Sequence, residues 1–150
     1  VGVAPVAGHV DRHGGPEQAA RAEVAEEVGL RVTALIPVAA GWRPNRCRRP
    51  TGGAPAGHHW TIYRATAAGT PSPASEEARN VRWVTPGELQ ALTDRTAAHA
   101  RGEIPAADFA AAPGLEPVWV EWLHALGLVG VTSGDLARIA ALARRPPGLA

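Results

Sequence analysis

The chain has 150 residues, 45% of them hydrophobic, and its formal net charge is +1 at pH 7. This composition predicts a folded globular protein, and the near-zero charge gives no general attraction to nucleic acid or to an anionic membrane. The single cysteine, Cys47, excludes an internal disulfide framework and is typical of a reducing compartment, so we expect a cytoplasmic protein. No apolar run approaches the ~18 residues that span a bilayer, so we expect no membrane partner.

The first feature along the chain is a glycine-rich loop that leads into a helix, over residues 8–30. Pro16 suits the first helical position, because the N–H that proline lacks would have no partner there. Glu17 complements the positive end of the helix dipole in the first turn. Gly29 suits the position after the helix, where the backbone takes a positive φ. Residues 1–7 before this feature form an extended apolar lead-in.

The predicted helix places three carboxylates along one face. At about 100° per residue they fall within roughly 100° of arc, and they belong to Glu23, Glu26 and Glu27. Like charges at these spacings destabilise a helix by about 0.2–0.5 kcal/mol per pair, so a chain with no use for them would do better with a lysine. Hard oxygen ligands grouped in this way suit Mg²⁺ or Mn²⁺. The alternative is a solvated acidic helix face.

Three strands are predicted downstream from runs of β-branched, aliphatic and aromatic residues, over 31–38, 58–65 and 81–84. Pro37 either confines the first of them to a sheet edge or marks its end. Between the strands, glycines and prolines predict a loop over 41–57 and a turn over 68–74.

Helices are predicted for the rest of the chain. Thr85 and Glu88 have the spacing of a capping box, so a helix is expected to run to about residue 100. Three more helices are expected further on, the last one capped by Ser133, over 106–112, 116–126 and 134–144.

The order of these elements predicts an α+β fold, with a single domain over residues 1–145 and a frayed tail over 146–150. Trp119 and Trp122 lie on a wide apolar helix face. We expect them in the core rather than on a protein-interaction surface.

Residues 8–30 resemble the signature box of the Nudix hydrolases, G-x5-E-x7-R-E-U-x-E-E-x-G-U, in which U is a bulky aliphatic residue. Seven of the nine specified positions match, namely Gly8, Glu23, Val24, Glu26, Glu27, Gly29 and Leu30. The first glutamate of the pattern is replaced by Gly14 and its arginine by Ala22. In the family these two are commonly paired, and replacing both partners of a buried pair can be near neutral. The resemblance therefore implies that a structural ion pair is lost and that the metal site is kept.

The resemblance implies a Nudix-like mixed sheet flanked by helices, with extra C-terminal helices. Several strands normally precede the box in this family, whereas seven residues precede it here. We therefore expect that the chain lacks some N-terminal strands or takes them from elsewhere. A homodimer is one way to cover the open sheet edge.

The resemblance also implies the residues of a metal site. Glu26 and Glu27 would be the main ligands of Mg²⁺ or Mn²⁺, and Glu23 would be a ligand or would orient the metal-bound water. Nudix proteins often carry an acid about six positions before a tryptophan, which matches Glu77 before Trp83. Glu77 is then a general base or an extra ligand, and the alternative is a solvated turn acid.

Polar residues of the loop before the helix have open roles. Asp11 suits equally a loop-stabilising role and a place near the metal. His9 and His13 could approach phosphate, although loop histidines are more often bystanders at the surface.

A cluster of arginines with no intervening acid follows Trp42, at Arg43, Arg46, Arg48 and Arg49. Guanidinium groups bind phosphate oxygens bidentately, and a tryptophan can stack on a base. These properties indicate a substrate-binding loop that uses Trp42, Arg43, Arg46 and Arg48. The alternative is a solvated basic loop with a core tryptophan, and nucleic acid binding is a weaker interpretation because the basic charge is local.

The sequence therefore predicts a Nudix-type, metal-dependent pyrophosphohydrolase. Its expected reaction is attack of water on a phosphorus of a nucleoside diphosphate joined to another moiety, so its partner is a small nucleotide-type substrate. The alternative is a non-catalytic Nudix-like nucleotide-binding domain, which the two replaced box positions and the short lead-in favour.

Overall fold

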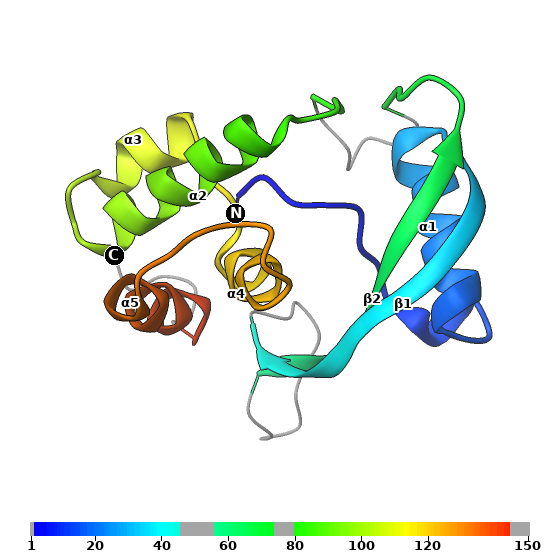
Figure 1. Cartoon of the computed structure of the whole chain (residues 1–150), viewed down its shortest axis with the longest axis horizontal. Helices are drawn as coiled ribbons and strands as arrows, with labels where there is room; N and C mark the ends of the chain where they lie inside the picture. The colour runs from blue at the N-terminus through cyan, green and yellow to red at the C-terminus, as the bar shows by residue number, and fades with distance from the viewer. Residues whose placement is uncertain (1, 46–55, 74–79, 145–150) are drawn as a thin grey trace. The chain divides into compact units, whose positions relative to one another are not determined.

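The computed structural model describes residues 2–45, 56–73 and 80–144 (Figure 1). In chain order the elements are the 3₁₀ helix η1 (Val10–Arg12), α1 (Pro16–Val28), β1 (Arg31–Pro44), β2 (Gly57–Ala68), α2 (Pro86–Ala100), α3 (Ala106–Ala111), α4 (Pro117–Ala125) and α5 (Ser133–Arg144). β1 and β2 pair as an antiparallel two-stranded sheet. The predicted α+β class is confirmed. Among the described helices, none combines the length and the apolarity needed to cross a bilayer.

The chain divides into two compact units. The loop–helix unit consists of Pro5–Ala40 and Thr61–Trp83, and the helical unit consists of Val1–Ala4, Gly41–Trp60 and Val84–Ala150. Each of the two strands contributes residues to both units. The single domain expected over 1–145 stays a prediction.

In the loop–helix unit, α1 lies along the paired strands (Figure 1). Its buried apolar side chains come from three elements of the sequence: Ala19 in α1, Leu30 just after it and Ile62 in β2. Arg21 Nη1 donates a hydrogen bond to the Val32 carbonyl oxygen over 3.2 Å, which joins the helix to β1. The helix is therefore held by both apolar burial and a polar contact.

Two predictions about strands need correction. β1 continues to Pro44, well past the predicted end, so Trp42 and Arg43 lie on a strand and not in a loop. Pro37 is tolerated inside β1, because each strand of a two-stranded sheet has an unpaired edge where a missing N–H costs no ladder bond. The strand predicted over 81–84 is wrong: these residues have no regular structure, and Trp83 is 69% exposed. Strand propensity alone does not form a strand where no neighbouring strand or sheet face packs against it.

The helices of the helical unit follow the predicted ranges closely. α2 begins with the predicted capping box: Glu88 N–H donates to Thr85 Oγ1, and Thr85 N–H donates to Glu88 Oε2 over 2.7 Å. The cap of α5 is one residue earlier than predicted. Thr132 Oγ1 accepts from the N–H of Asp135 over 3.1 Å, and Ser133 is the first helical residue. Thr132 and Ser133 both carry a hydroxyl group that suits an N-cap, so the sequence does not distinguish the two positions.

The core of the helical unit lies where α4 and α2 pack on α5. Its fully buried apolar side chains come from the segment before α4, from α4 and from α5, and they include Leu115, Val118, Val120 and Ile139. Thr96 is also fully buried, and its Oγ1 donates to the Leu115 carbonyl oxygen over 2.6 Å. Trp119 and Trp122 are buried, which confirms them as core residues.

Candidate functional site

The loop before α1 and the end of α1 both depend on glycine. Gly14 has a φ of 80°, in the left-handed region that favours glycine, and Gly15 precedes Pro16 at the start of the helix. At the other end Gly29 has a φ of 68°, and its N–H donates to the Ala25 carbonyl oxygen over 3.2 Å. The start and stop signals predicted for this helix are therefore confirmed.

Arg21 fixes α1 in place from one position before Ala22. Its Nη2 lies 2.8 Å from Oε1 of Glu17 within the helix, and its Nη1 bonds to the carbonyl of Val32 in β1. The guanidinium of Arg21 is therefore engaged by Glu17 and by β1. The hydrogen bond from Arg21 to Val32 joins the helix to β1 without involving position 22.

The three glutamates of α1 have different surroundings. The Glu23 side chain is 18% exposed, Glu27 is half-buried and Glu26 is exposed. A Cβ atom at residue 8 would overlap the Glu23 carboxyl group, so Gly8 leaves the space which that group fills. On the same carboxyl group, Oε1 lies 3.8 Å from Nε2 of His13. The fold therefore places the Glu23 carboxyl group in a small recess of the loop, beside the backbone of Gly8.

The ligand types of this helix face suit a hard divalent cation. Carboxylate oxygens are the ligands that Mg²⁺ prefers, and it is commonly held by only one or two of them together with water and substrate phosphates. Within the part of the chain that the structure describes, no three His, Cys, Asp or Glu side chains converge on one point. The recess around Glu23 thus fits a site of the open kind and does not fit a closed protein cage.

Trp42 and Arg43, predicted to bind substrate, lie on β1 in the helical unit. Trp42 is 42% exposed. Arg43 is already engaged within the protein: its Cζ lies 4.4 Å from the ring centroid of Trp122, and its Nε lies 4.0 Å from Oε2 of Glu121. Arg46, Arg48 and Glu77 lie outside the residues that the structure describes.

Glu121 is a half-buried carboxylate that the sequence analysis did not single out. Its side chain is 15% exposed, and Oε1 has no hydrogen-bond partner among the residues that the structure describes. Burial raises the pKa of this carboxyl group above its ordinary value, while attraction to Arg43 and Arg144 lowers it in part. A signal was present in the sequence, since Glu121 is the single acid of α4 and lies between apolar residues.

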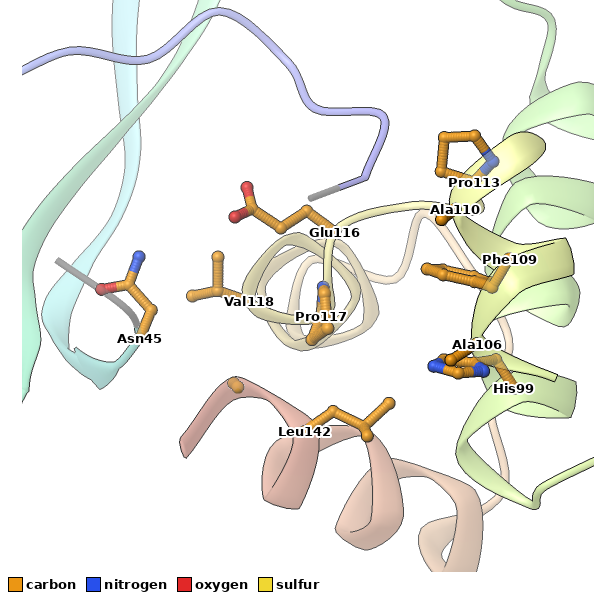
Figure 2. Close-up of a pocket in the computed structure, with 11 residues that line it drawn as sticks. Asn45, His99, Ala106, Phe109, Ala110, Pro113, Glu116, Pro117, Val118 and Leu142 are labelled. Carbon is orange, nitrogen blue, oxygen red and sulfur yellow. The ribbon is translucent and has the colours of Figure 1, made fainter. Parts of the chain in front are cut away.

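A cavity of about 500 Å³ lies in the helical unit (Figure 2). Its wall includes the rings of His99 and Phe109, which stack with centroids 4.3 Å apart. His99 Nδ1 donates to the Ile104 carbonyl oxygen over 2.8 Å, which fixes the ring. The residues predicted to bind metal or substrate do not line this cavity.

A model of the NUDIX domain family matches residues 2–105, which include η1, α1, both strands and α2. The match covers more than half of the chain, so the chain belongs to the NUDIX domain family. Nudix hydrolases act on pyrophosphate-containing substrates and generally use divalent metals such as Mg²⁺. No curated protein and no solved structure gives a match.

Proposed function

We propose that this chain is a metal-dependent hydrolase that cleaves the pyrophosphate linkage of a nucleoside diphosphate joined to another moiety. The observation that carries the proposal is the recess in which Gly8 makes room for the Glu23 carboxyl group. On a solvated acidic helix face the carboxylates would be exposed to water. The side chain of Glu23, in contrast, is 18% exposed and lies against the loop. The enclosed carboxylate favours a binding role.

Glu23, Glu26 and Glu27 are the residues that would hold Mg²⁺ or Mn²⁺. A divalent cation bound there supplies charge neutralisation for the phosphate oxygens and makes a bound water more acidic. Exposed Glu26 can change its rotamer freely, so it can complete a site around the more fixed Glu23. Glu77 is proposed to accept the proton of the attacking water.

Substrate binding is assigned to Trp42, Arg43, Arg46 and Arg48. The exposed indole of Trp42 supports a stacking role toward a nucleobase. Arginine side chains supply the paired N–H groups that match phosphate oxygens. Replacing Trp42 by alanine should therefore raise KM more than it lowers kcat.

The test is a hydrolysis assay with Mg²⁺ and a panel of nucleoside diphosphate sugars, dinucleotides and nucleoside triphosphates. We expect turnover of at least one substrate class and a fall of about 100-fold or more in kcat for Glu26→Gln, because positioning and charge neutralisation fail together. Glu17→Gln is the matched control, since Glu17 is on the same helix and pairs with Arg21.

Two results would overturn the proposal. One is a wild-type chain that hydrolyses no member of the panel, and the other is an equal fall in kcat for Glu26→Gln and Glu17→Gln. If the chain binds a nucleotide without turnover, the non-catalytic binding domain is correct instead. The replacement of the box glutamate and arginine by Gly14 and Ala22 favours this second function.

A further inference from the structure

The cavity of about 500 Å³ in the helical unit is walled mainly by segments that follow the region matched by the family model. Of the lining residues that the structure describes, two lie within residues 2–105, namely Asn45 and His99. The others belong to α3, to the segment between α3 and α4, to α4 and to α5. The family match therefore assigns no role to this cavity.

Hydrogen bonds hold α3 against α2 and fix one wall of the cavity. Arg95 of α2 donates from Nη2 to the Asp108 carbonyl oxygen over 2.9 Å and from Nε to the carbonyl oxygen of Ala112. Phe109 lies between these two positions in α3, is buried, and stacks on His99 with an angle of 11° between the rings. The wall is therefore formed before any ligand binds, which lowers the ordering cost of binding.

Most of the cavity wall is apolar, and much of it consists of rings. Pro113, Pro117 and Leu142 line it together with the stacked rings of His99 and Phe109 (Figure 2). Rings offer flat surfaces and edges against which an aromatic ligand packs with a gain beyond simple burial. An apolar cavity of about 150 Å³ is enough to hold benzene. A cavity of about 500 Å³ therefore has room for two fused aromatic rings.

His99 presents one hydrogen-bonding atom to this apolar space. Its Nδ1 donates to the Ile104 carbonyl oxygen, so in the neutral imidazole Nε2 carries the lone pair and can only accept. The ring projects from α2 toward Pro117 and Leu142, which places Nε2, the nitrogen farther from the backbone, at the cavity (Figure 2). A ligand that donates an N–H or O–H matches this atom, whereas a ligand that can only accept does not.

The polar side chains on the other side of the cavity also disfavour an anionic ligand. Asn45 and Glu116 line the cavity there, and the carboxylate of Glu116 points away from His99 (Figure 2). A negatively charged ligand would be repelled by this carboxylate and would find no donor at Nε2 of neutral His99. The lining therefore favours an uncharged ligand.

We propose that this cavity binds an uncharged, flat aromatic compound of about two fused rings that donates an N–H or O–H hydrogen bond to Nε2 of His99. Burial of the rings supplies most of the affinity, and the hydrogen bond fixes the orientation and selects compounds that carry a donor. The inference goes beyond the proposed hydrolysis, because it requires neither a metal ion nor a phosphate group.

The test compares indole with 1-methylindole, which has the same fused rings and lacks the N–H donor. Two-dimensional ¹H–¹⁵N NMR of the whole chain, without metal or nucleotide, follows the titration. We expect saturable indole binding with a Kd of about 1 mM or tighter, and shifts centred on the residues around the cavity. 1-Methylindole should bind at least about threefold more weakly, since it leaves Nε2 without a partner. Absence of saturable indole binding, shifts centred elsewhere, or equal affinity for the two compounds would overturn the proposal.

His99→Phe tests the role of the imidazole. This variant keeps a ring that can stack on Phe109 and removes the acceptor. Indole affinity should fall by at least about threefold, and 1-methylindole affinity should change by less than about twofold. Circular dichroism verifies the fold. Unchanged indole affinity would overturn the hydrogen bond to Nε2. Equal weakening of the two compounds would do the same, because the substitution would then act only on the shape of the cavity.

A second pair of variants tests the cavity itself. Ala110 of α3 is exposed and lines the cavity, so Ala110→Trp should fill part of it and abolish saturable binding of both compounds. Ala107→Trp is the matched control, because Ala107 is exposed on the same helix and is not among the described lining residues. It should leave both affinities unchanged. Wild-type affinity in Ala110→Trp, or an equal loss in the two tryptophan variants, would show that the compounds bind elsewhere.

Discussion

Two of the partly buried carboxylates that the structure describes lie at similar distances from a basic side chain but have different surroundings. Glu23 lies 3.8 Å from His13 and is 18% exposed, and Glu121 lies 4.0 Å from Arg43 and is 15% exposed. Around Glu23 the neighbours are a glycine backbone and a loop. Around Glu121 they are the tryptophans of α4, and one carboxyl oxygen finds no hydrogen-bond partner within the described part of the chain.

If Glu23 binds an ion and Glu121 does not, then burial and a basic neighbour do not by themselves identify a functional acid. Glu121 is set in an apolar helix, and desolvation dominates its behaviour, as the raised pKa indicates. Glu23 lies against the loop that begins at Gly8 and contains His13. We therefore expect substitutions at Glu23 to change ion binding and chemistry, and substitutions at Glu121 to change stability.

The largest effect should come from Glu23→Gln. It should lower kcat for hydrolysis by about 100-fold or more, because charge neutralisation and water positioning both depend on this carboxylate. Its free energy of unfolding should stay within about 0.5 kcal/mol of wild type. Steady-state kinetics and urea denaturation measure the two quantities. A kcat for Glu121→Gln as low as that of Glu23→Gln would remove the contrast.

Next in size is Arg43→Ala, which should lower the free energy of unfolding by about 1–3 kcal/mol, because a poorly solvated carboxylate loses a counter-charge. It also removes the guanidinium from the face of Trp122. Denaturation midpoints measure the loss. Arg31→Ala, an exposed arginine on the same strand, is the control and should be nearly neutral. The double variant Arg43→Ala with Glu121→Gln should recover part of the loss. A loss equal to that of Arg31→Ala would show that Arg43 does not stabilise Glu121.

A smaller effect is expected for Gly8→Ala. The new Cβ would displace the flexible end of Glu23, so Mg²⁺ affinity should fall by about tenfold while stability changes little. Gly87→Ala in α2 is a matched control, because nothing lies near the Cβ position there. Calorimetric titration with Mg²⁺ measures both variants. Wild-type affinity in Gly8→Ala would mean that the recess does not position the carboxylate.

The smallest effect concerns pH. The folded-state pKa of Glu121 is raised above 4.5, so its contribution to stability is fully present below about pH 4.5 and is lost as the pH rises through the raised pKa. Glu121→Gln should therefore be more stable relative to wild type at pH 7 than at pH 4. Denaturation at a series of pH values measures this difference. A difference that is constant with pH would contradict the raised pKa.

Much of the local structure was predictable from the sequence. The limits of α1 follow from Pro16 and Gly29, and the start of α2 follows from Thr85 and Glu88, because caps and turns form between residues close in the chain. The spacing of the three glutamates on one helix face depends only on helical periodicity. The tryptophans of α4 were predictable as core residues for the same reason.

Other features depended on contacts that local patterns do not encode. The length of β1 follows from its pairing with β2, and the run over 81–84 remains irregular without a strand beside it. His13 beside Glu23 depends on the path of a glycine loop whose direction no periodic pattern specifies. Glu121 beside Arg43 joins residues far apart in sequence.

The sequence by itself therefore determined that this chain carries a family signature with three carboxylates on one helix face, since helical spacing and end signals are local properties of the chain. The tertiary structure decided how far each carboxylate is enclosed and which basic side chain lies beside it. These outcomes depend on the dielectric surroundings and the packing that only distant segments of a folded chain create.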